Sequence, residues 1–240
     1  MKSQSIVFPK VGNQQEECED YLFASDTKMR YAIADGASDS IFSGLWAKSL
    51  VDTFIDFDNL SGDPEIVIDQ VCRRAINAWH DKIEWNNLKW NVKNKSVLGS
   101  YSTFIGIDIK KIEKNYRISC MAVGDSCSFI LTGRRLESFP VKDVSGFGLH
   151  PNLLWSGHGE PIFEDSEIQL PNYEMKNYTV DERSGIVLAS DAASKWIMEG
   201  GVERVRSLLE KLPEDREYWD DLRIKGEMKN DDISIITISL

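Results

Sequence analysis

The sequence predicts an α+β fold in which antiparallel sheets are covered by helices. Apolar runs typical of strands fall into groups joined by turns, and segments with helical spacing come in pairs between those groups. The steady alternation of strand and helix that a doubly wound parallel sheet needs is missing. No stretch rich in proline, glycine or serine divides the 240 residues, so we expect residues 1–240 to form a single domain.

The first half of the chain carries three predicted strands and two predicted helices. Apolar runs predict strands at 5–8, 21–24 and 28–34. Apolar residues at helical spacing predict a helix within 40–57. Asp63 followed by Pro64 marks the start of a second helix, because an acceptor side chain and then a proline suit the first positions of a helix. The polar, asparagine-rich segment 86–95 indicates a loop.

The second half returns to strands and ends on one. Runs at 102–107 and 116–123 predict a hairpin, and a third strand at 127–131 is followed by a turn at 132–135. Residues 137–177 show no clear period, and irregular segments of that length often carry function. A strand at 186–189, helices through Trp196 and over 202–212, and a last strand at 233–240 complete the prediction.

Composition limits the partners that this protein can have. A net charge of −11 without a basic block argues against binding nucleic acid or anionic membranes. No run reaches the length of a membrane span, and the first residues lack the apolar segment of a secretory signal. The four cysteines have no metal-type CxxC spacing, so we expect buried free thiols. These features predict a cytoplasmic protein, and we expect a monomer.

Acidic residues recur at the edges of the apolar strands. The most prominent is Asp35, which ends the buried run 31–34 and precedes a glycine. Each of these acids alone has an ordinary explanation as a turn former. The acidic strand edges are Glu19-Asp20, Asp35-Gly36, Asp125, Ser190-Asp191 and Asp231-Asp232.

If the fold gathered these carboxylates, they would repel one another unless a positive charge neutralised them. We find no arginine or lysine motif beside them, so a divalent cation is the favoured candidate. Ligand sets made only of oxygen favour Mg²⁺ or Mn²⁺, and the absence of a histidine and cysteine pattern disfavours zinc.

Taken in order, these motifs resemble the signature of the metal-dependent serine/threonine protein phosphatases of type 2C, the PPM family, in its bacterial form. The resemblance extends from residue 19 to residue 234 and implies a sandwich of two antiparallel β-sheets flanked by pairs of α-helices, with a two-metal centre at one end. The motifs that carry it are Glu19-Asp20, Asp35-Gly36, Ser102-Thr103, Gly124-Asp125-Ser126, Ser190-Asp191 and Asp231-Asp232-Ile233-Ser234.

The resemblance implies a role for each matching residue. Asp35 would bridge two ions of Mg²⁺ or Mn²⁺, the Gly36 carbonyl would bind one of them, and Asp191 and Asp231 would complete the site of the other. Asp35, Asp191 and Asp231 would therefore be the catalytic residues. The paired cations would activate a water for direct hydrolysis of phosphoserine or phosphothreonine in a protein substrate.

Three further acids would assist this centre. The resemblance implies that Glu19 and Asp20 bind or orient metal-bound waters, and that Asp125 helps to hold a third ion. With these residues every metal-ligand position of the family is filled, which favours an active enzyme.

Some positions depart from the family's pattern. Ala37 stands where many relatives have a histidine, and Gln15 stands where many have a phosphate-binding arginine, for which Lys10 is a candidate substitute. These departures motivate a second hypothesis, a catalytically weak, phosphatase-like regulatory or phosphoprotein-binding module. A third hypothesis is a metal-dependent hydrolase of small phosphoesters. His150 and His158, in the irregular segment, are candidates for proton transfer.

Overall fold

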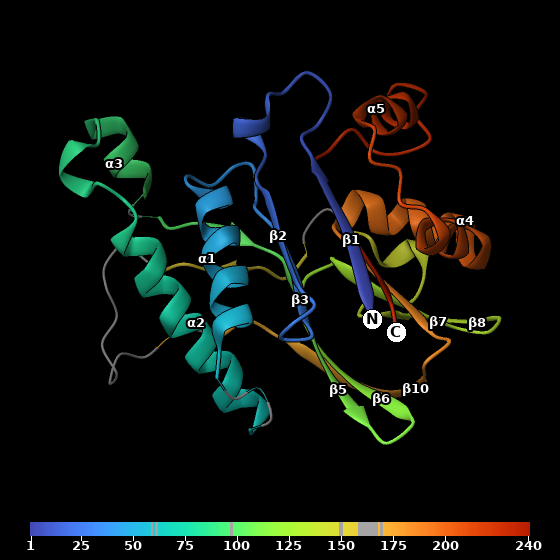
Figure 1. The fold of residues 1–240 in the computed structure, drawn as a ribbon. Helices are drawn as coiled ribbons and strands as arrows, with labels where there is room; N and C mark the ends of the chain where they lie inside the picture. Colours follow the sequence, from blue (N-terminus) through green and yellow to red (C-terminus); the bar gives the residue numbers. More distant parts are fainter. Residues whose placement is uncertain (59, 61, 97, 149–150, 158–167, 169) are drawn as a thin grey trace.

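The computed structural model describes residues 1–240 except 59, 61, 97, 149–150, 158–167 and 169. Two five-stranded antiparallel sheets stack against each other in it, with helices on their outer faces (Figure 1). The first sheet consists, in spatial order, of β1 (Lys2–Phe8), β12 (Ile233–Ser239), β11 (Gly185–Ala189), β7 (Cys127–Thr132) and β8 (Arg135–Phe139). The second consists of β10 (Glu174–Asp181), β6 (Asn115–Val123), β5 (Phe104–Ile112), β3 (Arg30–Asp35) and β2 (Asp20–Ser25).

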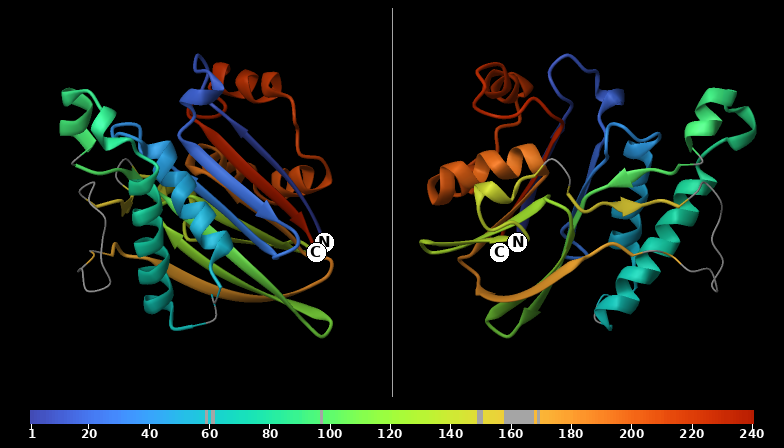
Figure 2. Two further views of the ribbon diagram at one scale, coloured as in Figure 1. Left: turned by 60° about the vertical axis from the view of Figure 1, so that its left-hand side comes forward. Right: turned by 180° about the vertical axis from the view of Figure 1, so that it is seen from behind.

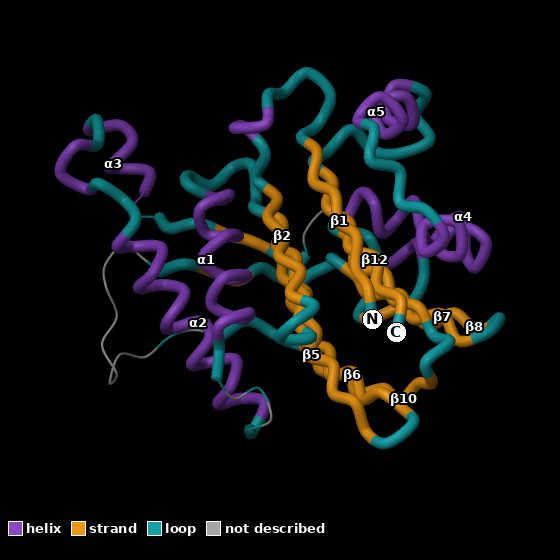
Figure 3. Tube along the Cα trace, viewed as in Figure 1, coloured by secondary structure: helices purple, strands orange, loops and turns teal. Residues whose placement is uncertain are grey.

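The helices cover the two outer faces of this sandwich (Figure 2). Helices α1 (Ser43–Asp56) and α2 (Pro64–Asp81) pack on the second sheet, and α4 (Asp191–Glu210) and α5 (Arg216–Ile224) belong to the core on the outer face of the first. Figure 3 shows the helices in purple outside the orange strands. A short sheet of β4 (Tyr101–Ser102) and β9 (Leu154–Trp155), the helix α3 (Trp90–Ser96) and three 3₁₀ turns complete the described chain. The predicted α+β sandwich flanked by helix pairs is confirmed.

Strand β3 is apolar from Tyr31 to Ala34 because both of its faces are buried there. Tyr31 and Ile33 face the core between the sheets, whereas Ala32 and Ala34 face the core beneath α1 and α2, and all four are fully buried. Alternating side chains point to opposite faces of a strand, so an unbroken apolar run is what a central layer requires. This double burial fixes the strand up to its last residue, Asp35.

Strand β11 repeats the pattern in the other sheet. Ile186 and Leu188 contribute to the core between the sheets, and Val187 and Ala189 to the core beneath α4. The chain leaves this strand at Ser190 and enters α4 at Asp191. Each sheet thus has an inner strand that is buried on both faces. Strand β3 ends at Asp35, and β11 is followed by Ser190 and then Asp191.

Several elements differ from the predictions made from sequence. The segment 86–95 is not a loop throughout, since α3 begins at Trp90, and strands β8 and β10 and helix α5 were not predicted. Strand β10 lies at a sheet edge, where only Tyr178 and Val180 are buried. Apart from Met175 its remaining residues are polar, so it lacks the continuous apolar run of β3 and β11.

Helix α4 contains the break that the sequence predicted after Trp196. Gly201 has a positive φ of 60° inside it and separates two helical segments. All four cysteines are free, and three of them are buried while Cys18 is half-buried. None of the helices in the described parts of the chain is both long and apolar enough to cross a bilayer.

Candidate metal centre

The end of β3 is held in place by hydrogen bonds to two segments of the chain, 102–103 and 19–20. Thr103 N–H and the Ser102 hydroxyl both donate to the Asp35 carbonyl, at 2.9 and 2.8 Å. Gly36 N–H donates to the Glu19 carbonyl at 3.2 Å, and the register of β2 and β3 places Asp20 opposite Asp35. The Asp35 backbone is therefore rigid, while its side chain faces an opening.

The corresponding end of the other sheet is tied together by two serines. Ser190 N–H donates to the Ser234 carbonyl at 3.0 Å, and Ser234 N–H donates to the Ser190 hydroxyl at 3.0 Å. These bonds bring the end of β11 beside the start of β12. Asp191 and Asp231 consequently lie close together, although they are forty residues apart in sequence.

A cavity of about 390 Å³ opens where the two sheet ends meet. Four of the predicted acids line it, namely Asp35, Asp125, Asp191 and Asp231. Gly36 lines it as well, as do Ala37, Ser38, Asp39, Thr103, Gly148, Pro151, Leu153 and Lys229. The structure thus brings five of the seven predicted metal ligands to one cavity.

Glu19 and Asp20 are not among the described residues that line this cavity. The Glu19 carboxylate accepts hydrogen bonds from Ser43, at the start of α1, and from Ser38, at the cavity rim. Asp20 lies deeper and is only 6% exposed, and neither of its carboxylate oxygens has a hydrogen bond of normal geometry within the described chain. An orphaned buried carboxylate of this kind is costly unless it is protonated or meets a cation.

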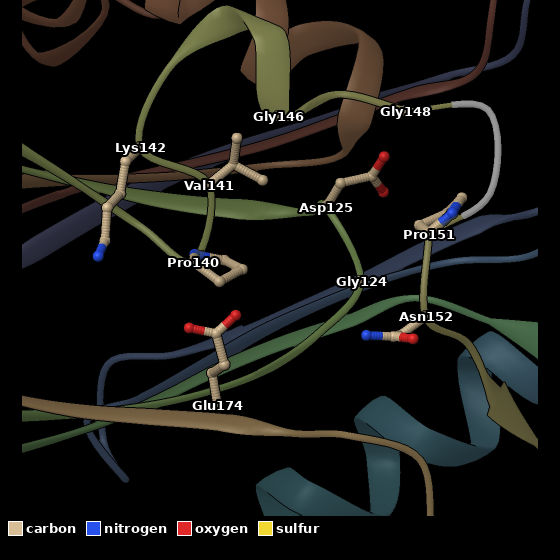
Figure 4. A pocket seen from close by; sticks show the side chains of 10 residues that line it. All are labelled: Gly124, Asp125, Pro140, Val141, Lys142, Gly146, Gly148, Pro151, Asn152 and Glu174. Atoms are coloured by element: carbon tan, nitrogen blue, oxygen red, sulfur yellow. The ribbon is translucent and has the colours of Figure 1, made fainter.

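A second cavity of about 450 Å³ adjoins the first (Figure 4). Asp125, Gly148 and Pro151 line both cavities, so the Asp125 carboxylate stands at their junction. The far side of the second cavity is formed by Lys142 and Glu174. The acidic site is consequently connected to a larger groove that carries charges of both signs.

Mutual repulsion and burial change the ionisation of these acids. Burial, and then the carboxylates of Asp20, Asp191, Asp231 and Asp125, raise the pKa of Asp35 well above its ordinary value. Asp35 therefore experiences the combined charge of the other acids. The predicted convergence of the acidic strand edges is a feature of the structure.

The pKa values of two neighbouring acids are raised in the same way. Burial and the Asp232 carboxylate raise the pKa of Asp20 to about 8, although the nearby Ser190 and Ser234 hydroxyls oppose the rise. Burial and Asp191 raise the pKa of Asp125 to about 6, and Lys229 opposes that rise. The charged form of each acid is disfavoured until a cation joins the cluster.

Lys229 was missed by the sequence analysis, which found no basic group beside the acids. Its ammonium lies 2.6 Å from Asp231 Oδ2 and 3.1 Å from Asp191 Oδ2. Burial lowers the pKa of Lys229, but Asp191 and Asp231 outweigh burial and raise it above its ordinary value. The only signal in the sequence was its position two residues before Asp231.

The donors of the site suit a hard cation. Carboxylates and the Gly36 carbonyl supply only oxygen, Asp20 has orphaned oxygens, and an ammonium already bridges Asp191 and Asp231. Among the described residues, no three histidine, cysteine, aspartate or glutamate side chains lie close enough together to hold a metal ion without moving. Carboxylates that repel one another stand apart until an ion neutralises them, so the arrangement fits Mg²⁺ or Mn²⁺ after small side-chain movements.

The structure shows where the residues that depart from the family's pattern lie in relation to the acidic cavity. The Lys10 ammonium donates to the Ser38 hydroxyl at 3.4 Å and so lies at the rim of the acidic cavity, whereas Gln15 is exposed in a 3₁₀ turn. Ala37 lines the cavity itself. His150 and His158 lie outside the described residues.

The raised pKa values predict how the stability of the metal-free protein depends on pH. A carboxyl with a raised folded-state pKa binds its proton more tightly when folded, so its stabilising effect is complete below its ordinary pKa, 3.8 for Asp20, and is lost as pH rises through about 8. In chelator we expect the melting temperature to fall between about pH 5 and about pH 8, with Asp20 alone contributing about 1.4 kcal/mol per pH unit.

Thermal melts in chelator across this pH range test the prediction, and an Asp20→Asn variant serves as the comparison. The variant should lose the part of the slope that Asp20 contributes, whereas Asp35 and Asp125, whose pKa values are also raised, should keep the rest. A melting temperature that is flat or rises with pH in the wild-type protein would contradict the prediction.

Comparison with known proteins identifies the fold. No protein-family model matches the sequence, and no curated protein matches it. The structure is similar to the catalytic domain of the serine/threonine protein phosphatase PstP in complex with two manganese ions, at 16% identity and a TM-score of 0.63, over 98% of this chain and 96% of that one.

Two further solved structures agree. The Mycobacterium tuberculosis phosphatase PstP/Ppp matches at 17% identity and a TM-score of 0.62, over 100% of this chain and 98% of that one. The Staphylococcus aureus serine/threonine phosphatase Stp1 matches at 14% identity and a TM-score of 0.57, over 100% and 94% of the two chains. The chain therefore has the fold of these phosphatases, and the resemblance seen in its motifs is confirmed at the level of fold.

Proposed function

We propose that this chain is a metal-dependent protein phosphatase that hydrolyses phosphoserine and phosphothreonine esters in proteins. The observation that carries the proposal is the meeting of Asp35, Asp125, Asp191 and Asp231 at one cavity between the two sheet ends. The fold shared with serine/threonine phosphatases, one of them in complex with two manganese ions, supports it.

In this proposal, Asp35 and the Gly36 carbonyl hold cations on the side of the second sheet, and Asp191 and Asp231 hold a cation on the side of the first. A pair of Mg²⁺ or Mn²⁺ ions would lower the pKa of a bound water and neutralise charge on the phosphoryl group. The protein's own contribution is a fixed set of carboxylates, because the backbone around Asp35 is hydrogen-bonded to Ser102, Thr103 and Glu19.

Glu19, Asp20 and Asp125 assist this centre. Glu19 binds Ser38 and Ser43 and so sets the shape of the cavity rim, while buried Asp20 adds negative charge behind Asp35. Asp125 stands between the two cavities, where it is placed to contact a third ion.

The groove next to the acidic cavity is the proposed location of the substrate's polypeptide. It is open to solvent beside Asp125, and Lys142 and Glu174 at its far side can contact residues that flank the phosphorylated one. Lys10, at the rim of the acidic cavity, is the candidate for a direct contact with phosphate. The proposal treats residues 1–240 as one catalytic unit that acts as a monomer in the cytoplasm, without a nucleic-acid or membrane partner.

Hydrolysis assays with and without divalent cations test this function. Protein stripped with chelator should not hydrolyse para-nitrophenyl phosphate or phosphoserine and phosphothreonine peptides, and added Mn²⁺ should restore turnover. Phosphopeptides should be preferred over a panel of phosphorylated metabolites, because the groove beside Asp125 can take a peptide.

The two alternatives give different results in the same assays. A phosphatase-like binding module would bind phosphopeptides without any Mn²⁺-dependent turnover. A hydrolase of small phosphoesters would turn over metabolites and leave the phosphopeptides intact.

A further inference from the structure

Lys229 forms an ion pair with one oxygen of each of the carboxylates of Asp191 and Asp231, and all three residues line the acidic cavity. In each carboxylate the other oxygen accepts a backbone hydrogen bond, from Ala192 N–H to Asp191 Oδ1 and from Asp232 N–H to Asp231 Oδ1. The Lys229 ammonium contacts the two Oδ2 atoms, at 3.1 Å for Asp191 and 2.6 Å for Asp231. A cation that binds this pair therefore either displaces the ammonium from the two Oδ2 atoms or lies close to its positive charge.

The backbone next to Lys229 is firmly anchored. The buried Arg223 guanidinium donates to the Asp231 carbonyl at 2.9 Å and to the Pro9 carbonyl at 2.8 Å. The Asn230 side chain accepts a hydrogen bond from Val11 N–H at 2.8 Å. The loop that carries Lys229 is thus fixed in relation to the acids.

The side chain beyond this anchored backbone is free to move away. The Lys229 side chain is 58% exposed, against 22% for Asp191 and 29% for Asp231. A lysine has a flexible stem of four carbons and carries its charge at the tip. Lys229 can consequently rotate into solvent without any change in the backbone, leaving both carboxylates in place.

We propose that Lys229 is a tethered cation that holds the Asp191–Asp231 pair in the metal-free protein and competes with the metal ion for it. The inference rests on the proposed function, since it takes Asp191 and Asp231 as metal ligands. The ammonium reduces the repulsion between the two carboxylates when no ion is bound. It also weakens metal binding, because an incoming ion has to displace the ammonium from the two carboxylates or bear its repulsion.

Mn²⁺ titration by calorimetry into chelator-stripped protein tests this competition. Lys229→Met removes the charge and keeps the length of the side chain, and it should bind Mn²⁺ about five- to twentyfold more tightly than the wild type. In chelator the same variant should melt about 2–4 °C below the wild type, because the repulsion between Asp191 and Asp231 is no longer offset. Saturating Mn²⁺ should abolish that deficit.

Two matched variants separate competition from a general change of charge. Lys225→Met removes a lysine from the same region, whose ammonium pairs with Asp221 at 3.1 Å, and it should bind Mn²⁺ as the wild type does. Lys229→Arg keeps a cation at the site and should also remain close to the wild type. Equal or weaker Mn²⁺ affinity in a folded Lys229→Met variant would overturn the inference.

The same titrations distinguish failure of this inference from failure of the proposed function. If the wild type binds Mn²⁺ and Asp191→Asn weakens that binding, the metal site stands whatever Lys229→Met does. If neither the wild type nor Lys229→Met binds Mn²⁺, or if Asp191→Asn binds it unchanged, both the inference and the metal site are overturned.

Discussion

Replacing Asp35 with asparagine is expected to abolish Mn²⁺-dependent hydrolysis, lowering kcat/KM by about a thousandfold or more. Asparagine has the same shape but no charge, so it weakens binding of cations at the point where the cavity's acids meet. The same change should not lower the stability of the metal-free protein. Asp35 is repelled by Asp20, Asp191, Asp231 and Asp125, and its removal relieves that repulsion.

The test combines kinetics on phosphopeptides with thermal melts in chelator. An inactive variant that melts at or above the wild-type temperature supports a chemical role for Asp35, because a misfolded variant would melt lower. Asp56→Asn is the control, since its carboxylate is 75% exposed and forms a surface ion pair with Lys28. Turnover by Asp35→Asn at the wild-type rate would refute the role.

Strands β3 and β11 could be predicted because a strand that is buried on both faces needs a continuous run of apolar residues. Residues 31–34 and 186–189 are continuous apolar runs, and the aspartate at or near the end of each run follows from the position where burial stops. Strand β10 and helix α5 could not be predicted in that way. Helix α5 has only nine residues and buries only Trp219 and Arg223, so its periodic pattern is too short to identify a helix from sequence.

The acids of the site could be predicted, but their arrangement could not. Their positions at strand edges are visible in the sequence, and their order resembles that of a known family. Their convergence depends on the pairing of β2 with β3 and of β11 with β12, which is decided by contacts between distant segments. Lys229 escaped notice for the same reason, because a lysine in a surface turn is ordinary until its ion-pair partners are known.

Replacing Gly36 with alanine is expected to disrupt the site through geometry instead of charge. A Cβ at this position would lie 2.7 Å from the Ser43 carbonyl carbon and 2.8 Å from the Glu19 carbonyl oxygen. Both are backbone atoms, so the end of β3 must move away from α1 and β2. Crowding of this kind costs about 1–3 kcal/mol, and we expect a melting temperature about 3–10 °C lower.

The same displacement should reduce activity, because Gly36 adjoins Asp35 and a shift of about 1 Å in a reacting group costs about a hundredfold in rate. Gly62→Ala is the control, since its Cβ would meet only the Val67 side chain at 3.5 Å, an ordinary contact. Thermal melts in chelator and phosphopeptide kinetics measure both effects. Stability and activity equal to the wild type in Gly36→Ala would show that the contacts of Gly36 with Glu19 and Ser43 do not fix the end of β3. We expect both variants to lose activity, but only Gly36→Ala to lose stability as well. That difference would separate the effect of positioning the acids from the effect of their charge.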